Sequence, residues 1–252
     1  MTPRSRAAAF PSVTASSVTR SREVGGVIFD LDDTLIDHRG SARQALRRWL
    51  PELGVTPTDE LVAAWFGAEE RHFATYSSGD ITYGEQRRRR LRQFLPAAGL
   101  VPGDDDELDD LFAGYLVRYR ASWITYDDVG PAVTTLHRSG ISLAVLTNGV
   151  ADQQHAKVAS TGRADLLGPV FTAEELGVAK PDPEAYLMVC RHLGLPPSSV
   201  VHVGDRYDLD VEGARAAGLQ AIHLDRRGTG PLDEPARITS LDQLSSRGPA
   251  DS

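Results

Sequence analysis

Val27-Ile28-Phe29-Asp30-Leu31-Asp32-Asp33-Thr34-Leu35 is the stretch that decides the fold. Its apolar residues predict a short buried strand over 24–29, and Asp30 and Asp32 follow where that strand ends. Open α/β sheets bind their ligands at the carboxyl ends of the strands. Two carboxylates 4 Å apart repel by about 4 kcal/mol at an effective dielectric of 20, so we expect a cation beside them. Taken alone, Asp32-Asp33-Thr34 could instead form a turn that caps a helix, without any cation.

Three later segments place polar residues in similar settings. The strand predicted over 141–147 ends in Thr147-Asn148-Gly149 and leads into a helix near 150–160. Lys180 lies between a short strand at 170–171 and a helix at 184–193, in a segment held rigid by two prolines. The strand predicted over 199–204 ends in Gly204-Asp205. We expect these polar residues to gather around a single divalent ion.

With the four segments in this order, the chain resembles the haloacid dehalogenase (HAD) superfamily over about residues 24–244. The segments around Asp30 and Asp205 are specific, whereas Thr-Asn-Gly and Lys-Pro would be weak signals if found singly. The resemblance implies a Rossmann-like α/β core with a parallel sheet and an inserted helical cap of the subfamily I (C1) type. It also implies a phosphatase that acts on a small phosphorylated metabolite such as a sugar phosphate, a nucleotide or a flavin-precursor phosphate.

The alternation of elements agrees with this architecture. Residues 38–122 show helical spacing in four runs. The first begins at Ser41 and the second at Pro57, while Leu91 with Phe94 marks the third and Leu108 with Phe112 marks the fourth. From residue 123 onward, helices near 129–138 and 208–217 alternate with strands, including one at 220–224, which predicts a parallel sheet. We therefore expect a core formed by 23–37 and 123–244, a cap formed by 38–122, and tails at 1–22 and 245–252.

Composition limits the classes of partner. The chain has 252 residues, a formal charge of −8 and 41% hydrophobic residues, as in an ordinary globular protein. The negative charge argues against nucleic acid or an anionic membrane as the main partner. Cys190, the only cysteine, cannot form an internal disulfide, and we expect it to be buried in a cytoplasmic protein. Residues 1–22 contain no acid and no apolar core of a secretory signal. Their composition resembles that of an organelle transit peptide, but a disordered tail or an overlong start is favoured.

The resemblance implies a role for each motif residue. Asp30 would be the nucleophile and Asp32 the general acid and base. Mg²⁺ would bind the carboxylates of Asp30 and Asp205 and the backbone carbonyl of Asp32, with Asp210 in direct contact or bridged by water. The phosphoryl group would contact Thr147, Asn148, Gly149 and Lys180.

Three alternative functions stay open at this point. A phosphosugar mutase of the same superfamily is the nearest, although Asp33 occupies a position where such mutases commonly have glycine. A haloacid dehalogenase is disfavoured by Asp32, because a halide leaves without a proton. A non-catalytic phosphate-binding regulator is disfavoured because Asp30, Asp32, Lys180 and Asp205 are all present.

Several other residues, most of them in the cap, could also have functional roles. The run from Arg87 to Arg90, with Arg92, cannot form one patch on a helix, so most of it is expected on a solvated face. Arg87 or Arg88 shares the apolar side and could reach substrate. His38, at the expected cap hinge, could face substrate, although a hinge or surface position is favoured. Asp208 is expected at a helix N-terminus. Trp49, Trp65 and Tyr83 are expected to pack inside the cap, although Tyr83 lies near a turn that could line the pocket.

Overall fold

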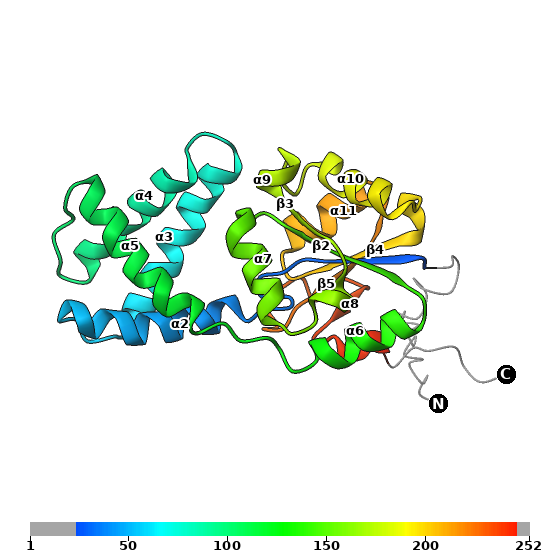
Figure 1. Ribbon diagram of the computed structural model, residues 1–252, viewed down its shortest axis with the longest axis horizontal. Helices are drawn as coiled ribbons and strands as arrows, with labels where there is room; N and C mark the ends of the chain where they lie inside the picture. The colour runs from blue at the N-terminus through cyan, green and yellow to red at the C-terminus, as the bar shows by residue number, and fades with distance from the viewer. Residues whose placement is uncertain (1–23, 246–252) are drawn as a thin grey trace, which may run out of the picture.

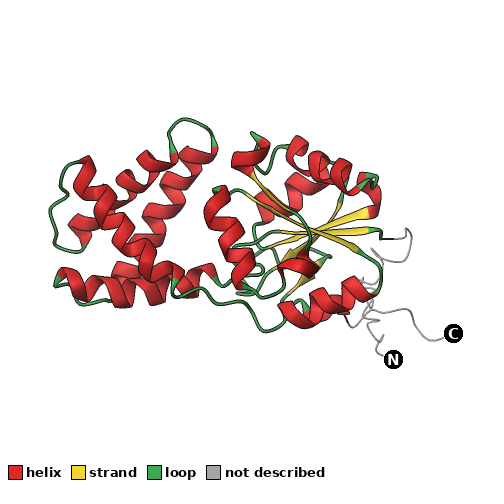
Figure 2. Cartoon of the chain, viewed as in Figure 1, coloured by secondary structure: helices red, strands yellow, loops and turns green. Residues whose placement is uncertain are grey.

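The computed structural model describes residues 24–245, so the expected tails lie outside the described residues, except for Ser245 at the end of a short helix. Figure 1 shows two lobes that lie side by side. One contains a sheet covered by helices on both faces. The other contains only helices and loops, as the colouring of Figure 2 shows.

A six-stranded parallel sheet forms the centre of the first lobe, in the order β3-β2-β1-β4-β5-β6. Phe29 of the central strand β1 lies opposite Val145 and Val203, so the segment after it is flanked by both neighbouring strands. This confirms the expected α/β class. The strands are β1 (Gly26–Phe29), β2 (Ser142–Thr147), β3 (Val170–Thr172), β4 (Val200–Gly204), β5 (Gln220–Leu224) and β6 (Arg237–Ile238).

Helices cover both faces because successive side chains of a strand point to opposite sides. Val27 and Phe29 pack in one apolar cluster with Val133, whereas Ile28 packs in another with Tyr186. Helices α6 (Val129–Arg138), α8 (Ala164–Leu167) and α12 (Asp242–Ser245) lie on the first side (Figure 1). On the second side are α10 (Pro183–Leu193) and α11 (Gly213–Ala216), while α7 (Ala151–Ser160) and α9 (Ala173–Leu176) flank β3.

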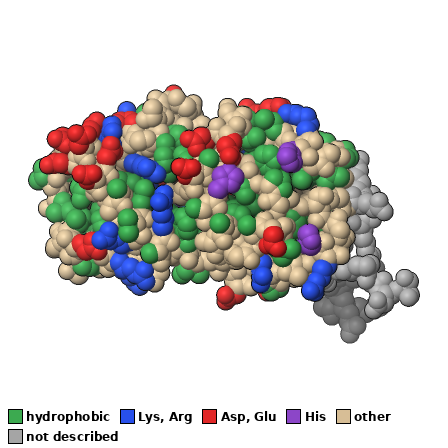
Figure 3. All heavy atoms as spheres, viewed as in Figure 1, with side chains coloured by type: hydrophobic (Ala, Val, Ile, Leu, Met, Phe, Trp, Pro, Cys, Tyr) green, Lys and Arg blue, Asp and Glu red, His purple; other side chains and the backbone are tan. Residues whose placement is uncertain are grey.

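The second lobe is a bundle of α2 (His38–Trp49), α3 (Asp59–Ser77), α4 (Tyr83–Ala97) and α5 (Asp105–Arg120), with a 3₁₀ turn at Leu50–Leu53. Trp65 lies at its centre, with ring centroids 4.4 Å from Tyr115 and 5.0 Å from Phe94. Trp49 and Trp65 are thus packing residues, as expected. Acidic side chains gather at the outer end of this lobe (Figure 3), where α5 begins.

Two connections join the lobes, and they lie against each other. The N–H of Asp37 donates to the carbonyl of Ile124 over 2.8 Å, and Ile36 forms an antiparallel bridge with Thr125. The chain therefore enters and leaves the helical lobe at one place, next to the end of β1. This geometry suits a cap that covers the carboxyl edge of the sheet.

One local expectation was wrong, and one expected helix has an unexpected form. Pro57 is not the first helical residue, because the hydroxyl of Thr58 accepts from the N–H of Leu61 and caps α3 at Asp59. The helix expected over 208–217 is a π-helix, η3 (Tyr207–Glu212), followed by the short α11. Such π segments are frequent at functional sites. Within the described residues, no helix is both long enough and apolar enough to span a bilayer.

Candidate active site

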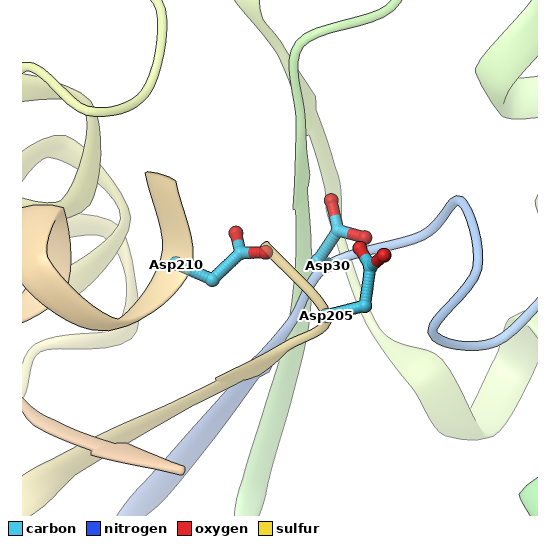
Figure 4. Close-up of side chains that lie close together, drawn as sticks. All are labelled: Asp30, Asp205 and Asp210. Atoms are coloured by element: carbon cyan, nitrogen blue, oxygen red, sulfur yellow. The ribbon is translucent and has the colours of Figure 1, made fainter. Parts of the chain in front are cut away.

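Three aspartates lie together at the carboxyl edge of the sheet. Asp30 follows β1, Asp205 follows β4 and Asp210 lies in η3, and one carboxylate oxygen of each falls within 4.8 Å of the others. Figure 4 shows the carboxylates of Asp30 and Asp205 close together, while Asp210 approaches from the other side. These residues are separated by up to 180 positions in the chain, so the structure brings together what the motifs predicted.

Lys180 links two of these carboxylates. Its Nζ lies 2.7 Å from Oδ1 of Asp30 and 2.6 Å from Oδ1 of Asp210, and its side chain is buried. Asn148 fixes the backbone of Lys180, because its Oδ1 accepts from the Lys180 N–H at 2.8 Å and its Nδ2 donates to the Lys180 carbonyl at 2.7 Å. The side chain of Asn148 thus positions the lysine, where we had expected a direct contact with phosphate.

Asp210 is held by several donors. Besides Lys180, its carboxylate accepts from the backbone N–H of Arg206 at 2.9 Å and lies 3.0 Å from Nε2 of His202. A Cβ at residue 204 would lie 2.3 Å from the Asp210 carboxyl carbon, so Gly204 makes room for this side chain. With both oxygens engaged, Asp210 is better placed to hold Lys180 and to reach a cation through water than to bind it directly.

The charges of this cluster favour a divalent cation. Burial raises the pKa of Asp30, the ammonium of Lys180 opposes that rise and repulsion from Asp210 adds to it, which gives a pKa of about 7. Burial, with repulsion from Asp30 and Asp210, raises the pKa of Asp205 well above its usual range. Both carboxylates therefore resist ionisation together unless a cation neutralises them. All-oxygen ligands suit Mg²⁺, so these residues fit that ion.

Asp32 has two partners that the sequence did not suggest, both from α7. Nζ of Lys157 lies 2.5 Å from its Oδ1, and Nε2 of Gln154 donates to its Oδ2 over 2.8 Å. Burial would raise the pKa of Asp32, but the charges of Lys157 and His38, together with the hydrogen bonds from Lys157 and Gln154, outweigh burial and lower that pKa below its ordinary value. The composition could have drawn attention to this residue, because Lys157 and Lys180 are the only lysines among 27 Lys and Arg residues.

Gln154 also connects Asp32 to the residues at the end of β2. Its Nε2 lies 2.7 Å from Oγ1 of Thr147. The Thr147 hydroxyl accepts there and accepts from the Gly149 N–H at 3.4 Å, so its own hydrogen is available to a phosphoryl oxygen. A Cβ at residue 149 would lie 2.4 Å from the Gln154 side chain. Gly149 therefore makes room for Gln154, which is more specific than the close backbone approach that we expected.

A cleft of about 1200 Å³ separates this edge from the helical lobe. His38 lines it, with Nδ1 2.6 Å from the Tyr119 hydroxyl and Nε2 3.3 Å from Glu69, so it is neither a surface residue nor a plain hinge. Tyr83 also lines the cleft. The cap side of the cleft therefore combines aromatic side chains such as Tyr83 and Tyr119 with polar and charged ones, including His38 and Glu69.

Within the arginine run of α4, the residue that lines the cleft is not Arg87 or Arg88. Arg88 forms ion pairs with Asp105 and Asp109 of α5, away from the cleft, and Arg87 stacks on Tyr83 and Phe112. Arg90 lines the cleft instead: it is 4% exposed and donates to Glu69 over 2.9 Å.

Asp208 pairs with Arg206 on the surface, which agrees with the expected position in the first turn of a helix. Cys190 is buried, as expected.

Comparison with known proteins identifies the family. The model of the haloacid dehalogenase-like hydrolases matches residues 24–218, which include all four motifs. This chain belongs to the haloacid dehalogenase-like hydrolase family. The HAD chain is 31% identical over 233 residues to a phosphoserine phosphatase of Thermus thermophilus, covering 83% of this chain and 92% of that one. It is also 31% identical over 212 residues to a glyceraldehyde 3-phosphate phosphatase of Methanopyrus kandleri, covering 81% and 85%.

Solved structures show the same fold. The HAD-hydrolase YfnB of Bacillus subtilis, solved with bound magnesium, superposes with a TM-score of 0.77 at 20% identity, covering 89% of this chain and 98% of that one. A 2-haloacid dehalogenase of Pseudomonas syringae superposes with a TM-score of 0.61 at 32% identity, covering 88% and 97%. The fold therefore occurs with two kinds of hydrolysis, and the site residues must distinguish them.

Proposed function

We propose that this HAD hydrolase cleaves small phosphomonoesters with Mg²⁺, through an aspartyl phosphate formed on Asp30. The observation that supports this most directly is the position of Asp30. Its carboxylate lies at the floor of the cleft, 2.7 Å from Nζ of Lys180 and beside Asp205. A carboxylate placed next to a cation-binding cluster can attack phosphorus while its charge and that of the phosphate are neutralised.

Different residues of the site would bind the cation and the substrate. Asp30, Asp205 and the carbonyl of Asp32 would hold Mg²⁺, with Asp210 bridged by water. The bound ion would neutralise the negative charge of the phosphoryl oxygens. The hydroxyl of Thr147 and the ammonium of Lys180 would bind those oxygens directly. The cap would exclude bulk water from the cleft.

Two steps follow from this placement. A carboxylate oxygen of Asp30 attacks phosphorus, the bond from phosphorus to the alcohol oxygen breaks, and protonated Asp32 gives its proton to that oxygen. Asp32, now a carboxylate, then takes a proton from water while the water oxygen attacks the phosphorus of the acyl phosphate. Inorganic phosphate leaves and Asp30 is restored. The dianionic substrate favours the protonated form of Asp32 in the first step, and Lys157 favours the carboxylate in the second.

Phosphatase chemistry is favoured over dehalogenation by Asp32. A halide departs as an anion and needs no general acid, whereas an alkoxide does. Asp32 is oriented by two buried donors, which is consistent with a proton-transfer role. The relatives named above carry the names of phosphatases of three-carbon esters, so we propose small alkyl phosphates as the substrate class.

Metal removal tests this proposal. Phosphate release is measured for a panel of small alkyl phosphates, with Mg²⁺, with excess chelator, and after Mg²⁺ is restored. The cation contributes several kcal/mol to the transition state, so chelation should lower the rate by at least about 100-fold and Mg²⁺ should recover it. Chloride release from 2-chloropropionate is measured in parallel. Chloride release without phosphate release would contradict the proposal.

A further inference from the structure

We propose that Lys157 and Gln154 are positioning residues that hold the Asp32 carboxylate in place for proton transfer to the leaving group, a role that rests on the function proposed above. Each oxygen of Asp32 has its own donor from α7, at 2.5 Å from Lys157 and 2.8 Å from Gln154. The carboxylate cannot turn about its Cβ–Cγ bond without losing these charge-assisted contacts.

The burial of these groups indicates a built arrangement. The side chains of Lys157 and Gln154 are each 1% exposed, whereas that of Asp32 is 32% exposed and lines the cleft. A buried ammonium is costly unless it is paired, and within the described residues the ion-pair partner of Lys157 is Asp32. The donors thus support Asp32 from the protein side and leave its other side open to substrate.

The choice of lysine is informative in this chain. Lysine occurs only at positions 157 and 180, and all other Lys or Arg positions hold arginine. These two lysines contact the two carboxylates that take part in the proposed chemistry. A guanidinium would engage both carboxylate oxygens as a planar fork. The compact ammonium engages only Oδ1 of Asp32 and leaves Oδ2 for Gln154.

Gln154 makes the position of Asp32 depend on the phosphate-binding residues. The same Nε2 that donates to Asp32 lies 2.7 Å from Oγ1 of Thr147, and Gly149 leaves the space that Gln154 fills. Thr147 is proposed to bind the phosphoryl group. Gln154 therefore sets the distance between that group and the acid that protonates its leaving oxygen.

The pair also lies where the leaving alcohol would be. Nζ of Lys157 is 5.4 Å from the ring centroid of Tyr119, which belongs to α5 of the cap. Lys157, Asp32 and Tyr119 all line the cleft between the two lobes. The alcohol part of a substrate bound at Asp30 would occupy this space, next to the supported carboxylate.

Leaving-group dependence separates a positioning role from a structural one. An alkoxide needs the proton of Asp32, whereas p-nitrophenolate leaves readily without it. In Lys157→Met and in Gln154→Leu, we expect kcat/KM for an alkyl phosphate to fall by about 10- to 100-fold. We compare kcat/KM because it covers the steps up to formation of the aspartyl phosphate and not its hydrolysis, in which Asp32 acts as the base for every substrate. For p-nitrophenyl phosphate, kcat/KM should change less than about threefold.

His155→Ala is the matched control, because His155 lies on the same helix, is exposed and contacts only Glu175 among the hydrogen-bonding partners described. It should behave as wild type with both substrates. Equal losses on the alkyl and aryl substrates in both α7 variants, or no loss on either, would overturn the inference. Should Lys157→Met fail to fold, Gln154→Leu decides by the same criteria. A wild-type protein that releases no phosphate from either substrate would instead overturn the proposed function.

Discussion

Replacing Asp30 by asparagine is expected to lower the rate of phosphate release by at least about 10⁴-fold, because loss of an attacking group removes the covalent route. The amide has nearly the same shape but cannot form an acyl phosphate. Colorimetric phosphate release with saturating Mg²⁺ and an alkyl phosphate measures the effect.

The Asp30→Asn protein should remain folded. Repulsion among the carboxylates of Asp30, Asp205 and Asp210, two of which are buried, is relieved when one becomes neutral, so urea unfolding should show no loss of stability. Asp152→Asn is the matched control, because Asp152 is exposed in the first turn of α7. Phosphate release that survives Asp30→Asn at a near-normal rate would contradict the assignment of the nucleophile.

Lys180→Met is expected to reduce both stability and activity. The ammonium is buried between Asp30 and Asp210, and its removal leaves these carboxylates without their counter-charge. Breaking a buried ion pair from one side typically costs about 3–5 kcal/mol, so we expect the free energy of unfolding in urea, without Mg²⁺, to fall by about that amount. The loss of phosphoryl stabilisation should lower kcat/KM by about 100- to 1000-fold.

The control for Lys180→Met is Arg191→Met, since Arg191 forms an exposed ion pair with Glu184 on α10. Surface pairs of this kind contribute about 0–1 kcal/mol, so this variant should unfold close to wild type and keep its activity. An unfolding free energy for Lys180→Met that matches this control would show that Lys180 does not neutralise the carboxylates in the folded protein.

Much of the core could be predicted from the sequence because its strands are short apolar runs followed by polar turns. The strands expected at 24–29, 141–147, 199–204 and 220–224 appear within two residues of those bounds. Strand β6 was not predicted, because two residues, Arg237 and Ile238, are too few to show an alternating pattern. The start of α3 was misplaced because Pro57 and Thr58 both suit a helix start, and the hydroxyl of Thr58 decides it.

The sequence predicted the site residues that belong to motifs near strand ends. It did not predict the partners of Asp32 that helix α7 contributes. Asp30, Lys180 and Asp205 meet at the sheet edge, as their positions after strands indicated. Gln154 and Lys157 lie 122 and 125 residues from Asp32. Helical periodicity alone suggests which face of α7 is buried, but it does not say that a buried lysine on that face meets an acid.

Trapping the phosphoryl group on Asp30 tests the account most directly. Asp32→Asn should still accept the phosphoryl group of p-nitrophenyl phosphate, which needs no proton donor, but should hydrolyse the intermediate slowly because no base activates water. With Mg²⁺ we expect a burst of about one nitrophenolate per protein molecule. After acid quench and borohydride reduction, fragmentation of the tryptic peptide 23–39 should show homoserine at position 30. A missing burst, or a modified residue anywhere else in the chain, would contradict the proposed chemistry.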